Sequence, residues 1–277
     1  MLKFDFKNNN VYIYGLEEFD LPHTLDCGQA FRWIQNDNIW SGVAFNHYLE
    51  LEKTSDGTII LYNTTEEDFK NIWIDYFDLE RDYTEIVKKL SKDETLKKAC
   101  DYSYGIRILN QEPFETLCSF IISQNNNIKR IKGIIERLCE NFGEKKNAFY
   151  TFPTADKMAT LTLEDLAPLR SGFRAKYLLD AAKKVANGEV DLQNLKNLDL
   201  DTARAELMKI VGVGPKVADC CLLFSHKHIE AFPKDVWIKR AMEVLFGGEL
   251  PKCAKGLEGI AQQYIFFYAR DTKLLGE

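Results

Sequence analysis

The chain has 277 residues, of which 45% are hydrophobic, so it is long enough to bury a substantial core and to form two domains. Residues 1–6 alternate apolar with charged side chains, and no run reaches the roughly 18 apolar residues of a membrane span, so we expect a cytoplasmic protein without membrane contact. The seven cysteines show no C-x-x-C spacing, which disfavours zinc and iron–sulfur sites and predicts reduced thiols.

The net charge of −6 argues at first against nucleic acid, because proteins that neutralise phosphates are usually basic. The charge is uneven, however. Residues 116–240 hold 20 Lys and Arg against 15 Asp and Glu, a local charge of +5, which leaves −11 for the remainder. Two interpretations stay open: the positive stretch faces a polyanion, or it is only a solvated surface.

The first elements in chain order have a strand pattern. Short runs at 11–14, 30–34, 40–44 and 58–62 are separated by Asn, Asp and Gly, which is typical of an antiparallel sheet. After Thr65 the apolar spacing becomes helical, beginning with Phe69 and Trp73. We predict an N-terminal α+β domain over residues 1–110.

From Glu115 onward nearly every segment has helical spacing, with apolar faces in 117–121, 131–138 and 177–185. Thr162 followed by Asp165 resembles a helix cap, and Asp201 is expected to cap the helix that follows it. No repeat or flexible linker separates the two parts. The predicted fold class is therefore α+β: the antiparallel sheet domain packs on a larger α-helical domain, residues 111–277, whose C-terminal helix packs back near the N-terminal domain.

Two helical runs flank the segment Val211-Gly212-Val213-Gly214-Pro215. Glycine permits positive φ, and proline suits the first position of a helix, so the segment predicts a helix-hairpin-helix. Gly212 and Gly214 would let backbone N–H groups approach a phosphate at the helix N-terminus, so that an acidic protein could grip DNA. The alternative is a tight helix connection and nothing more.

Lys216 follows this turn directly. The positive end of the helix dipole disfavours an ammonium there, and partial desolvation would add to this, so the site favours the neutral amine that nucleophilic attack requires. Asp219 and Cys220, three and four residues later, could share its face. Asp235 begins another helix 19 residues after Lys216. The alternatives are a solvated lysine and a helix-capping aspartate, and the second is compatible with a catalytic role.

A helix-hairpin-helix followed by a Gly/Pro-rich stretch and an aspartate resembles the helix-hairpin-helix (HhH-GPD) DNA glycosylase superfamily, in which a lysine after the turn marks the bifunctional glycosylase/lyases. Further stretches resemble the 8-oxoguanine DNA glycosylases: the G-Q-x-F-R-W element in 26–33, Q-E-P-F-E in 111–115, and the triple Asn before I-x-R in 119–130. The resemblance runs from about Leu25 to Arg270. By itself the triple Asn marks either a helix end whose amides face DNA or an ordinary polar turn.

The resemblance implies excision of 8-oxoguanine, preferentially opposite cytosine, from double-stranded DNA in base excision repair. Lys216 would attack C1′ of the lesion sugar and form a Schiff base, and Asp235 would stabilise positive charge and assist proton movement. β-Elimination would then nick the strand. No metal or other cofactor is required, and we expect a monomer, associated with the nucleoid if the cell is bacterial.

The family also implies a pocket for the flipped lesion. The Gly28 carbonyl would accept the N7 hydrogen that guanine lacks, Cys220 and Phe266 would sandwich the base, and Gln262 would meet its pairing edge. Gln262 and Phe266 are four residues apart on an expected C-terminal helix, so they can face one pocket. Two alternatives remain: the neighbouring Gln263 takes the place of Gln262, or Phe266 is a core residue.

Around the opposite base, the resemblance assigns Asn125, Arg130 and Arg174 to filling the gap and reading the orphaned cytosine, with Phe173 as an aromatic wedge. Each arginine could instead contact a phosphate. One position departs from the family: Trp237 stands where animal members carry a histidine that contacts the 5′ phosphate of the lesion.

Two other functions compete with this one. The first is a related glycosylase for oxidised pyrimidine, for adenine opposite 8-oxoguanine, or for alkylated bases; several of these carry a four-cysteine cluster, whereas Cys253 is the only cysteine after Cys221. The second is a helix-hairpin-helix DNA-binding module without catalysis, which the pairing of Lys216 with Asp235 disfavours.

Overall fold

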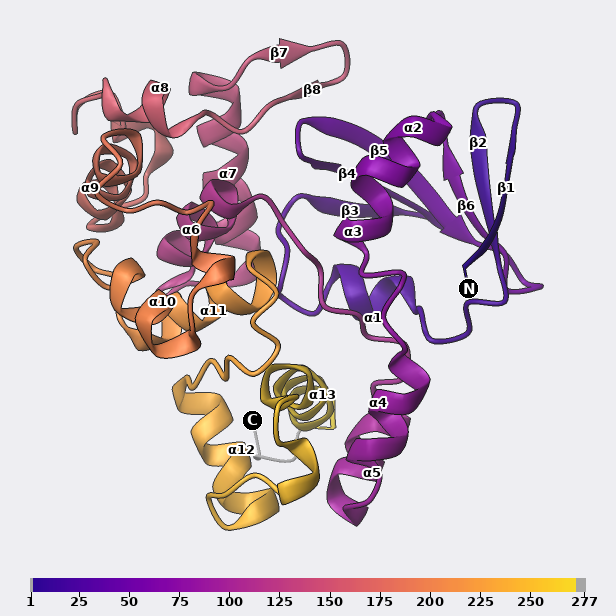
Figure 1. The fold of residues 1–277 in the computed structure, drawn as a ribbon. Helices are drawn as coiled ribbons and strands as arrows, with labels where there is room; N and C mark the ends of the chain where they lie inside the picture. The colour runs from indigo at the N-terminus through magenta and orange to yellow at the C-terminus, as the bar shows by residue number, and fades with distance from the viewer. Residues whose placement is uncertain (1, 273–277) are drawn as a thin grey trace.

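The computed structural model describes residues 2–272 (Figure 1). Its N-terminal part is a six-stranded antiparallel sheet in the order β1-β2-β6-β5-β4-β3. The strands are β1 (Lys3–Lys7), β2 (Asn10–Tyr14), β3 (Trp33–Asn36), β4 (Ile39–Ala44), β5 (His47–Lys53) and β6 (Ile59–Tyr62). The four predicted runs fall on β2, β3, β4 and β6, although β3 begins only at Trp33 because residues 26–32 form a loop.

Every second side chain of the central strands packs between the sheet and the short helices that cover one of its faces. Val11 and Ile13 of β2, like Leu49 and Leu51 of β5, are completely buried on one face. Over that face lie α2 (Glu66–Asp68), the π-helical turn η1 (Phe69–Trp73) and α3 (Ile74–Tyr76). The sheet and this cover form one small apolar core, separate from the larger core of the helical part.

The remainder is mostly helical, as predicted, and the α+β fold class is confirmed. The longer helices are α4 (Tyr83–Leu90), α5 (Glu94–Tyr102), α6 (Pro113–Ser123), α7 (Ile128–Phe142), α9 (Arg174–Ala186), α10 (Leu200–Leu207), α11 (Pro215–Ser225), α12 (Val236–Phe246) and α13 (Glu258–Asp271). Short ones are α1 (Leu21–Leu25), α8 (Ala155–Ala159), η2 (Ala167–Leu169), η3 (Leu195–Asn197) and η4 (Lys252–Ala254). A two-stranded hairpin, β7 (Lys145–Lys146) with β8 (Phe149–Tyr150), interrupts the helices where none was expected.

The predicted cap of α10 is wrong by two residues. Asp199 occupies the N-cap position with extended backbone, and its side chain accepts a 3.0 Å hydrogen bond from the Thr202 amide. Asp201 already lies in the first turn and pairs with Arg204 at 2.6 Å. The Thr162–Asp165 hydrogen bonds do form, but they close a turn and not a helix.

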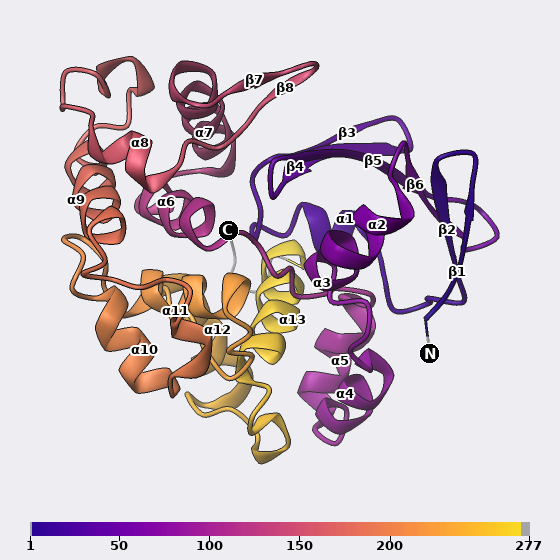
Figure 2. The same ribbon diagram turned by 45° about the horizontal axis from the view of Figure 1, so that its top comes forward.

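The last helix lies between two other helices. Figures 1 and 2 both place α13 between α12 on one side and α5 on the other. The Ser103 hydroxyl donates to the Tyr264 carbonyl at 3.1 Å, and the His23 ring lies 4.6 Å from that of Phe267. Residues of α4 and α5 share the apolar core of the helical part. The division of the chain into two domains at residue 110 stays a prediction. The last segment of the predicted second domain, 273–277, lies outside the described residues.

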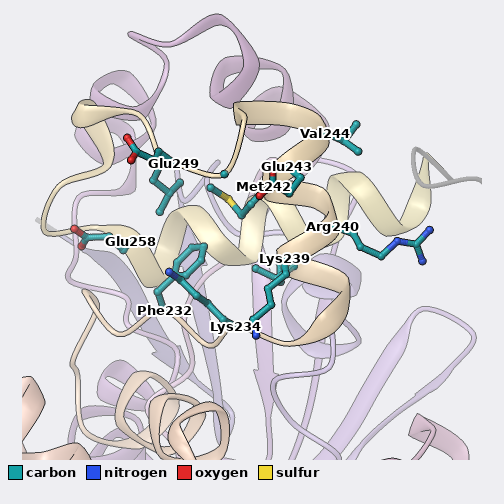
Figure 3. A pocket seen from close by; sticks show the side chains of 12 residues that line it. Phe232, Lys234, Lys239, Arg240, Met242, Glu243, Val244, Glu249 and Glu258 are labelled. Carbon is teal, nitrogen blue, oxygen red and sulfur yellow. The ribbon is translucent and has the colours of Figure 1, made fainter.

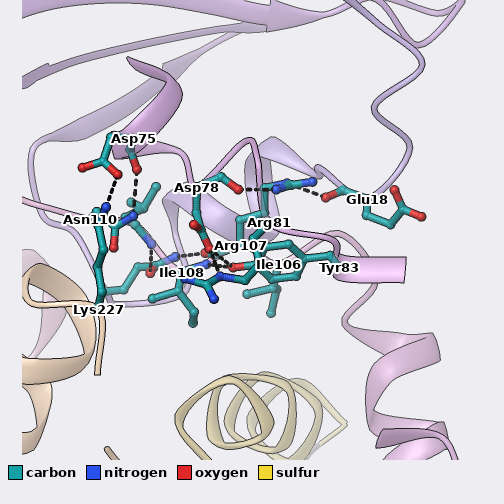
Figure 4. Close-up of polar contacts among 12 residues, drawn as sticks. Glu18, Asp75, Asp78, Arg81, Tyr83, Ile106, Arg107, Ile108, Asn110 and Lys227 are labelled. Atoms are coloured by element: carbon teal, nitrogen blue, oxygen red, sulfur yellow. Dashed lines mark hydrogen bonds and ion pairs between the residues drawn. The ribbon is translucent and has the colours of Figure 1, made fainter. Parts of the chain in front are cut away.

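Arg107 joins the segments that meet beneath the sheet (Figure 4). Its buried guanidinium donates to the carbonyls of Glu18 at 2.7 Å and Asp78 at 2.6 Å and lies 4.5 Å from the centre of the Tyr83 ring. Beside it, Lys227 after α11 pairs with the Asp75 carboxylate. Of these contacts, the Lys227–Asp75 pair is the one that connects α11 to the segment covering the sheet.

Candidate active site

The helix-hairpin-helix consists of α10, the turn 208–214 and α11. Gly212 has φ +84°, and a Cβ there would lie 2.4 Å from atoms of the Tyr177 ring, so only glycine fits. Gly214 is different: it is the N-cap of α11 with φ −102°, and the space around it is open. The turn is tied down by the Val211 amide, which donates to the Asp180 carboxylate at 2.7 Å.

Gly212→Ala is expected to destabilise the fold by about 2–4 kcal/mol, because the strained backbone and the displaced Tyr177 ring both cost free energy. It should also weaken binding to undamaged duplex DNA. Gly214→Ala is the matched control and should cost less than about 1 kcal/mol, because it meets neither a positive φ nor a neighbouring atom. Denaturant unfolding measures the stability of both variants. Equal stability of the two variants would contradict the assigned constraint.

Lys216 lies in the first turn of α11, as predicted, with its amine 5.4 Å from the centre of the Phe120 ring. It lines a small pocket between the helical part and the 27–28 loop. All six residues predicted for catalysis and lesion binding line this pocket: Gly28, Lys216, Cys220, Asp235, Gln262 and Phe266. Five further residues complete it, namely Cys27, Phe120, Phe224, Pro233 and Gln263.

Asp235 reaches the pocket from the start of α12. It is the N-cap, and its carboxylate accepts a 2.7 Å hydrogen bond from the Ile238 amide. The start of α12 therefore holds the carboxylate in place.

Cys220 and Asp219 face different ways on α11. Asp219 turns to α10, where it pairs with Arg204 at 2.7 Å, while Cys220 lines the pocket. Burial raises the pKa of Cys220 to about 11, against the opposing charge of Lys216. The thiol is therefore neutral at physiological pH and offers a polarisable, uncharged surface.

The loop that carries Gly28 is held by the hydrogen bonds of the next residue. Gly28 has φ +91°, a conformation that glycine favours. The fully buried Gln29 next to it donates to the carbonyls of Thr24 and Arg107, both at 2.8 Å, and accepts from the Leu109 amide at 3.0 Å. The glutamine of the G-Q element thus fixes the backbone beside the pocket.

Phe266 is half-buried and belongs to the pocket rim more than to the core. Its ring meets Trp237 edge-on at 6.0 Å and has the Arg270 guanidinium 5.5 Å from its centre. Trp237, the departure from the family pattern, therefore supports the aromatic wall of the pocket.

The residues predicted to face the opposite base lie outside the pocket, around the start of α9 and the turn between α6 and α7. Arg174 is only 3% exposed and donates to the backbone carbonyls of Gln124 at 2.9 Å, Asn125 at 2.9 Å and Ser171 at 3.2 Å. Desolvation, together with the charge of Arg130, lowers the pKa of Arg174. In this structure Arg174 holds the turn, and the exposed Arg130 is the arginine presented outward.

Phe173 and Asn125 project from the same region. Phe173 is 47% exposed, and its ring contacts Tyr177, the residue that also covers Gly212. Asn125 is exposed with φ +47°, and Asn127 caps α7, so the triple Asn is a helix boundary, as predicted. The hairpin and the opposite-base residues are thus connected through Tyr177.

A larger hollow lies elsewhere, between α12 and α13 (Figure 3). Phe232, Met242 and Leu250 give it apolar walls, and Lys239 and Glu258 stand at its edge. None of the predicted site residues lines it. Cavity size alone would therefore have selected a place that holds none of the predicted site residues.

Among residues 2–272 there is no group of three or more His, Cys, Asp or Glu side chains able to hold a metal ion. Within the same range no helix has the length and apolar character to cross a membrane. All seven cysteines are free thiols, and six of them are buried.

Two family models match consecutive parts of the chain. Residues 11–117 match the N-terminal domain of 8-oxoguanine DNA glycosylase, and residues 118–260 match the HhH-GPD superfamily base excision DNA repair proteins. This chain belongs to the 8-oxoguanine DNA glycosylases of the HhH-GPD superfamily. The sheet domain and the hairpin domain of the family are thus both present.

Individual members of the family are similar over most of their length. The N-glycosylase/DNA lyase of Saccharomyces cerevisiae is 31% identical over 258 residues, which cover 80% of this chain and 67% of the yeast protein. A probable N-glycosylase/DNA lyase of Methanothermobacter thermautotrophicus is 32% identical and covers 76% of this chain and 77% of its own length. This chain therefore spans about two thirds of the yeast glycosylase.

Solved structures agree in fold. The 8-oxoguanine glycosylase/lyase of Clostridium acetobutylicum, in complex with duplex DNA containing cytosine opposite 8-oxoguanine, superposes with a TM-score of 0.91 and 43% identity over 99% of this chain and 98% of the other. The 3-methyladenine DNA glycosylase of Archaeoglobus fulgidus, at 21% identity and a TM-score of 0.69, shares the fold. The N-terminal family model and the clostridial likeness favour 8-oxoguanine over the competing lesions.

Proposed function

We propose that this 8-oxoguanine DNA glycosylase/lyase of base excision repair uses Lys216 as its nucleophile and Asp235 as the charged group that assists it. The observation that carries the proposal is the meeting of both side chains in one pocket with four residues suited to hold a base. Family membership supplies the glycosylase and lyase activity and duplex DNA as substrate. The assignment of roles to single residues is ours.

The nucleophile is the amine of Lys216, at the N-terminus of α11. Attack of the amine on C1′ of the lesion nucleotide breaks the glycosidic bond and releases the base. Of the two protons on the amine, one passes to the departing base and the other to the ring oxygen O4′ as the sugar ring opens, which gives a Schiff base between C1′ and Lys216. Removal of a C2′ proton then expels the 3′ phosphate, and water releases the lysine. Asp235, fixed by the Ile238 amide, stabilises the positive charge at C1′ and at the amine.

The pocket suits a flat, flipped base. Extruding a nucleotide costs a few kcal/mol, which contacts in the pocket must offset. Cys220 is uncharged and Phe266 is braced by Trp237, so the two present apolar surfaces to the base faces. The Gly28 loop offers its carbonyl to the N7 hydrogen, and Gln262 meets the pairing edge.

The duplex is held from two sides. The backbone N–H groups near Gly212 and Gly214 bind phosphates of the lesion strand at the start of α11. On the other side, Asn125 and Phe173 fill the gap that the flipped lesion leaves, while Arg130 and the turn held by Arg174 read the cytosine. We further propose a cytoplasmic monomer that needs no cofactor, nucleoid-associated in a bacterium, with the two domains dividing near residue 110.

A substrate panel tests the proposal. Excision rates are measured on duplexes with 8-oxoguanine, oxidised pyrimidine, 3-methyladenine, or adenine opposite 8-oxoguanine, and with 8-oxoguanine opposite each of the four bases. We expect 8-oxoguanine opposite cytosine to be fastest. Equal rates opposite all four bases would refute the cytosine preference, and faster excision of another lesion would refute the assigned substrate.

Arg130→Ala should reduce the preference for cytosine by about 10-fold, since one good base contact is worth about 1–3 kcal/mol of discrimination. Lys129→Ala is the matched control, because Lys129 is exposed on the same first turn of α7. Loss of a phosphate contact should slow all substrates alike and leave the preference unchanged. If Arg130→Ala slowed all substrates equally, Arg130 would be assigned to a phosphate contact and not to the cytosine.

A further inference from the structure

Gln263 lines the lesion pocket, yet it has no role in the proposal above. We propose that Gln263, held by Cys27, fixes the direction of the Gln262 amide and thereby makes the pocket select a guanine pairing edge over an adenine edge. This inference rests on the proposed function, in which Gln262 meets the pairing edge of the flipped base.

Three buried side chains form a continuous hydrogen-bonded row. The Cys27 thiol lies 3.6 Å from Oε1 of Gln263, and Nε2 of Gln263 donates to Oε1 of Gln262 at 2.6 Å. Cys27 is 1% exposed, and each glutamine is 5% exposed. All three line the pocket, so the row ends at the place where the base would sit.

The row has a direction. A protonated thiol is a donor and only a weak acceptor, so the oxygen of Gln263 faces Cys27 and its nitrogen faces Gln262. Burial, which raises the pKa of Cys27 to about 11, keeps the thiol protonated at physiological pH. The carbonyl of Thr24 also lies 3.5 Å from this sulfur, but it already accepts a 2.8 Å hydrogen bond from Gln29, so the single thiol proton is directed to Oε1 of Gln263.

The orientation of the Gln262 amide matters because guanine and adenine carry donors and acceptors in opposite places on their pairing edges. The guanine edge presents an acceptor at O6 and donors at N1 and N2, whereas the adenine edge presents a donor at N6 and an acceptor at N1. With Oε1 of Gln262 toward Gln263, the Gln262 nitrogen donates to O6 and the second lone pair of Oε1 accepts from N1–H. An adenine edge would need the amide turned over, which would break the bond to Gln263.

An unsupported glutamine could turn over to suit either purine at little cost. Inside the row, turning Gln262 would bring its N–H donor against the N–H donor of Gln263 in a buried site. A buried donor without an acceptor costs free energy. Gln263 is therefore a positioning residue that sets specificity without touching the reacting atoms.

The test compares 8-oxoguanine with 8-oxoadenine, both opposite cytosine, by kcat/KM in the 277-residue chain. Gln263→Leu should reduce the preference for 8-oxoguanine about 10-fold, because it removes the donor to Gln262. Gln263→Glu should reduce it further, since a carboxylate accepts and forces the Gln262 amide to turn. Cys27→Ser, which keeps a donor, should retain the preference within about twofold.

Lyase activity on a preformed abasic site supplies the control, because that substrate has no base to read. It should stay within about twofold of the unchanged protein in all three variants. Failure of the unchanged protein to excise 8-oxoguanine would remove the proposed function itself. Excision in the unchanged protein with an unaltered preference in both Gln263 variants would overturn this inference alone. A parallel loss of excision and lyase activity would also overturn it, since Gln263 would then only support the fold.

Discussion

Lys216→Gln is expected to abolish covalent trapping of the protein on an 8-oxoguanine duplex by borohydride, and to lower excision by at least about 10³-fold. Borohydride reduces a Schiff base to a stable amine, and the glutamine amide cannot form one. Binding to the same duplex should persist, because the hairpin backbone and the opposite-base residues remain. Gel analysis of trapped complexes and equilibrium binding measure the two effects.

The control for this experiment is Lys157→Gln, which removes the same charge from an exposed position on α8. Its trapping should equal that of the unchanged protein. Covalent trapping of the Lys216→Gln variant would contradict the assignment of Lys216 as the nucleophile and indicate that another amine attacks.

Asp235→Asn is expected to lower excision by about 10²–10³-fold while leaving the fold nearly as stable as before. The asparagine side chain can still accept from the Ile238 amide, so α12 keeps its cap, but the negative charge beside Lys216 is lost. Single-turnover excision and denaturant unfolding separate these two consequences.

Asp235→Ala removes the cap as well as the charge, so it should lose about 1 kcal/mol of stability in addition. The difference between the Asn and Ala variants isolates the structural part of the side chain. Full excision activity in Asp235→Asn would show that Asp235 is only a cap.

The residues with local signals could be predicted from the sequence. Pro215 before Lys216, the helix start at Asp235 and the four-residue spacing of Gln262 and Phe266 each depend on neighbours in the chain, and the structure has them in the expected elements. The resemblance to a known family then brought these segments together in one pocket. Composition and periodicity alone did not predict that these segments meet.

Other features depend on contacts between distant segments and left no such signal. Phe120 had an apolar helical position like its neighbours, and only packing decides that its ring lies under Lys216. Gln263 joins Cys27, which is 236 positions away in the chain. Asp199 and Asp201 are equally good capping residues two positions apart, so the residue at which α10 begins could not be chosen from the local pattern.

The pocket takes Gly28 and Cys27 from a loop held by Gln29, and it takes Lys216 and Asp235 from the starts of two helices much later in the chain. In the proposed function, the residues that read the edge of the base therefore lie on other stretches of the chain than those that break the bond, and only Cys220, which packs on the base face, shares α11 with Lys216. We expect an exchange of residues 26–31 and 262–263 between related glycosylases to transfer the choice of base while the leaving-group chemistry continues unchanged. Such an arrangement lets natural selection change what is repaired without rebuilding how it is repaired.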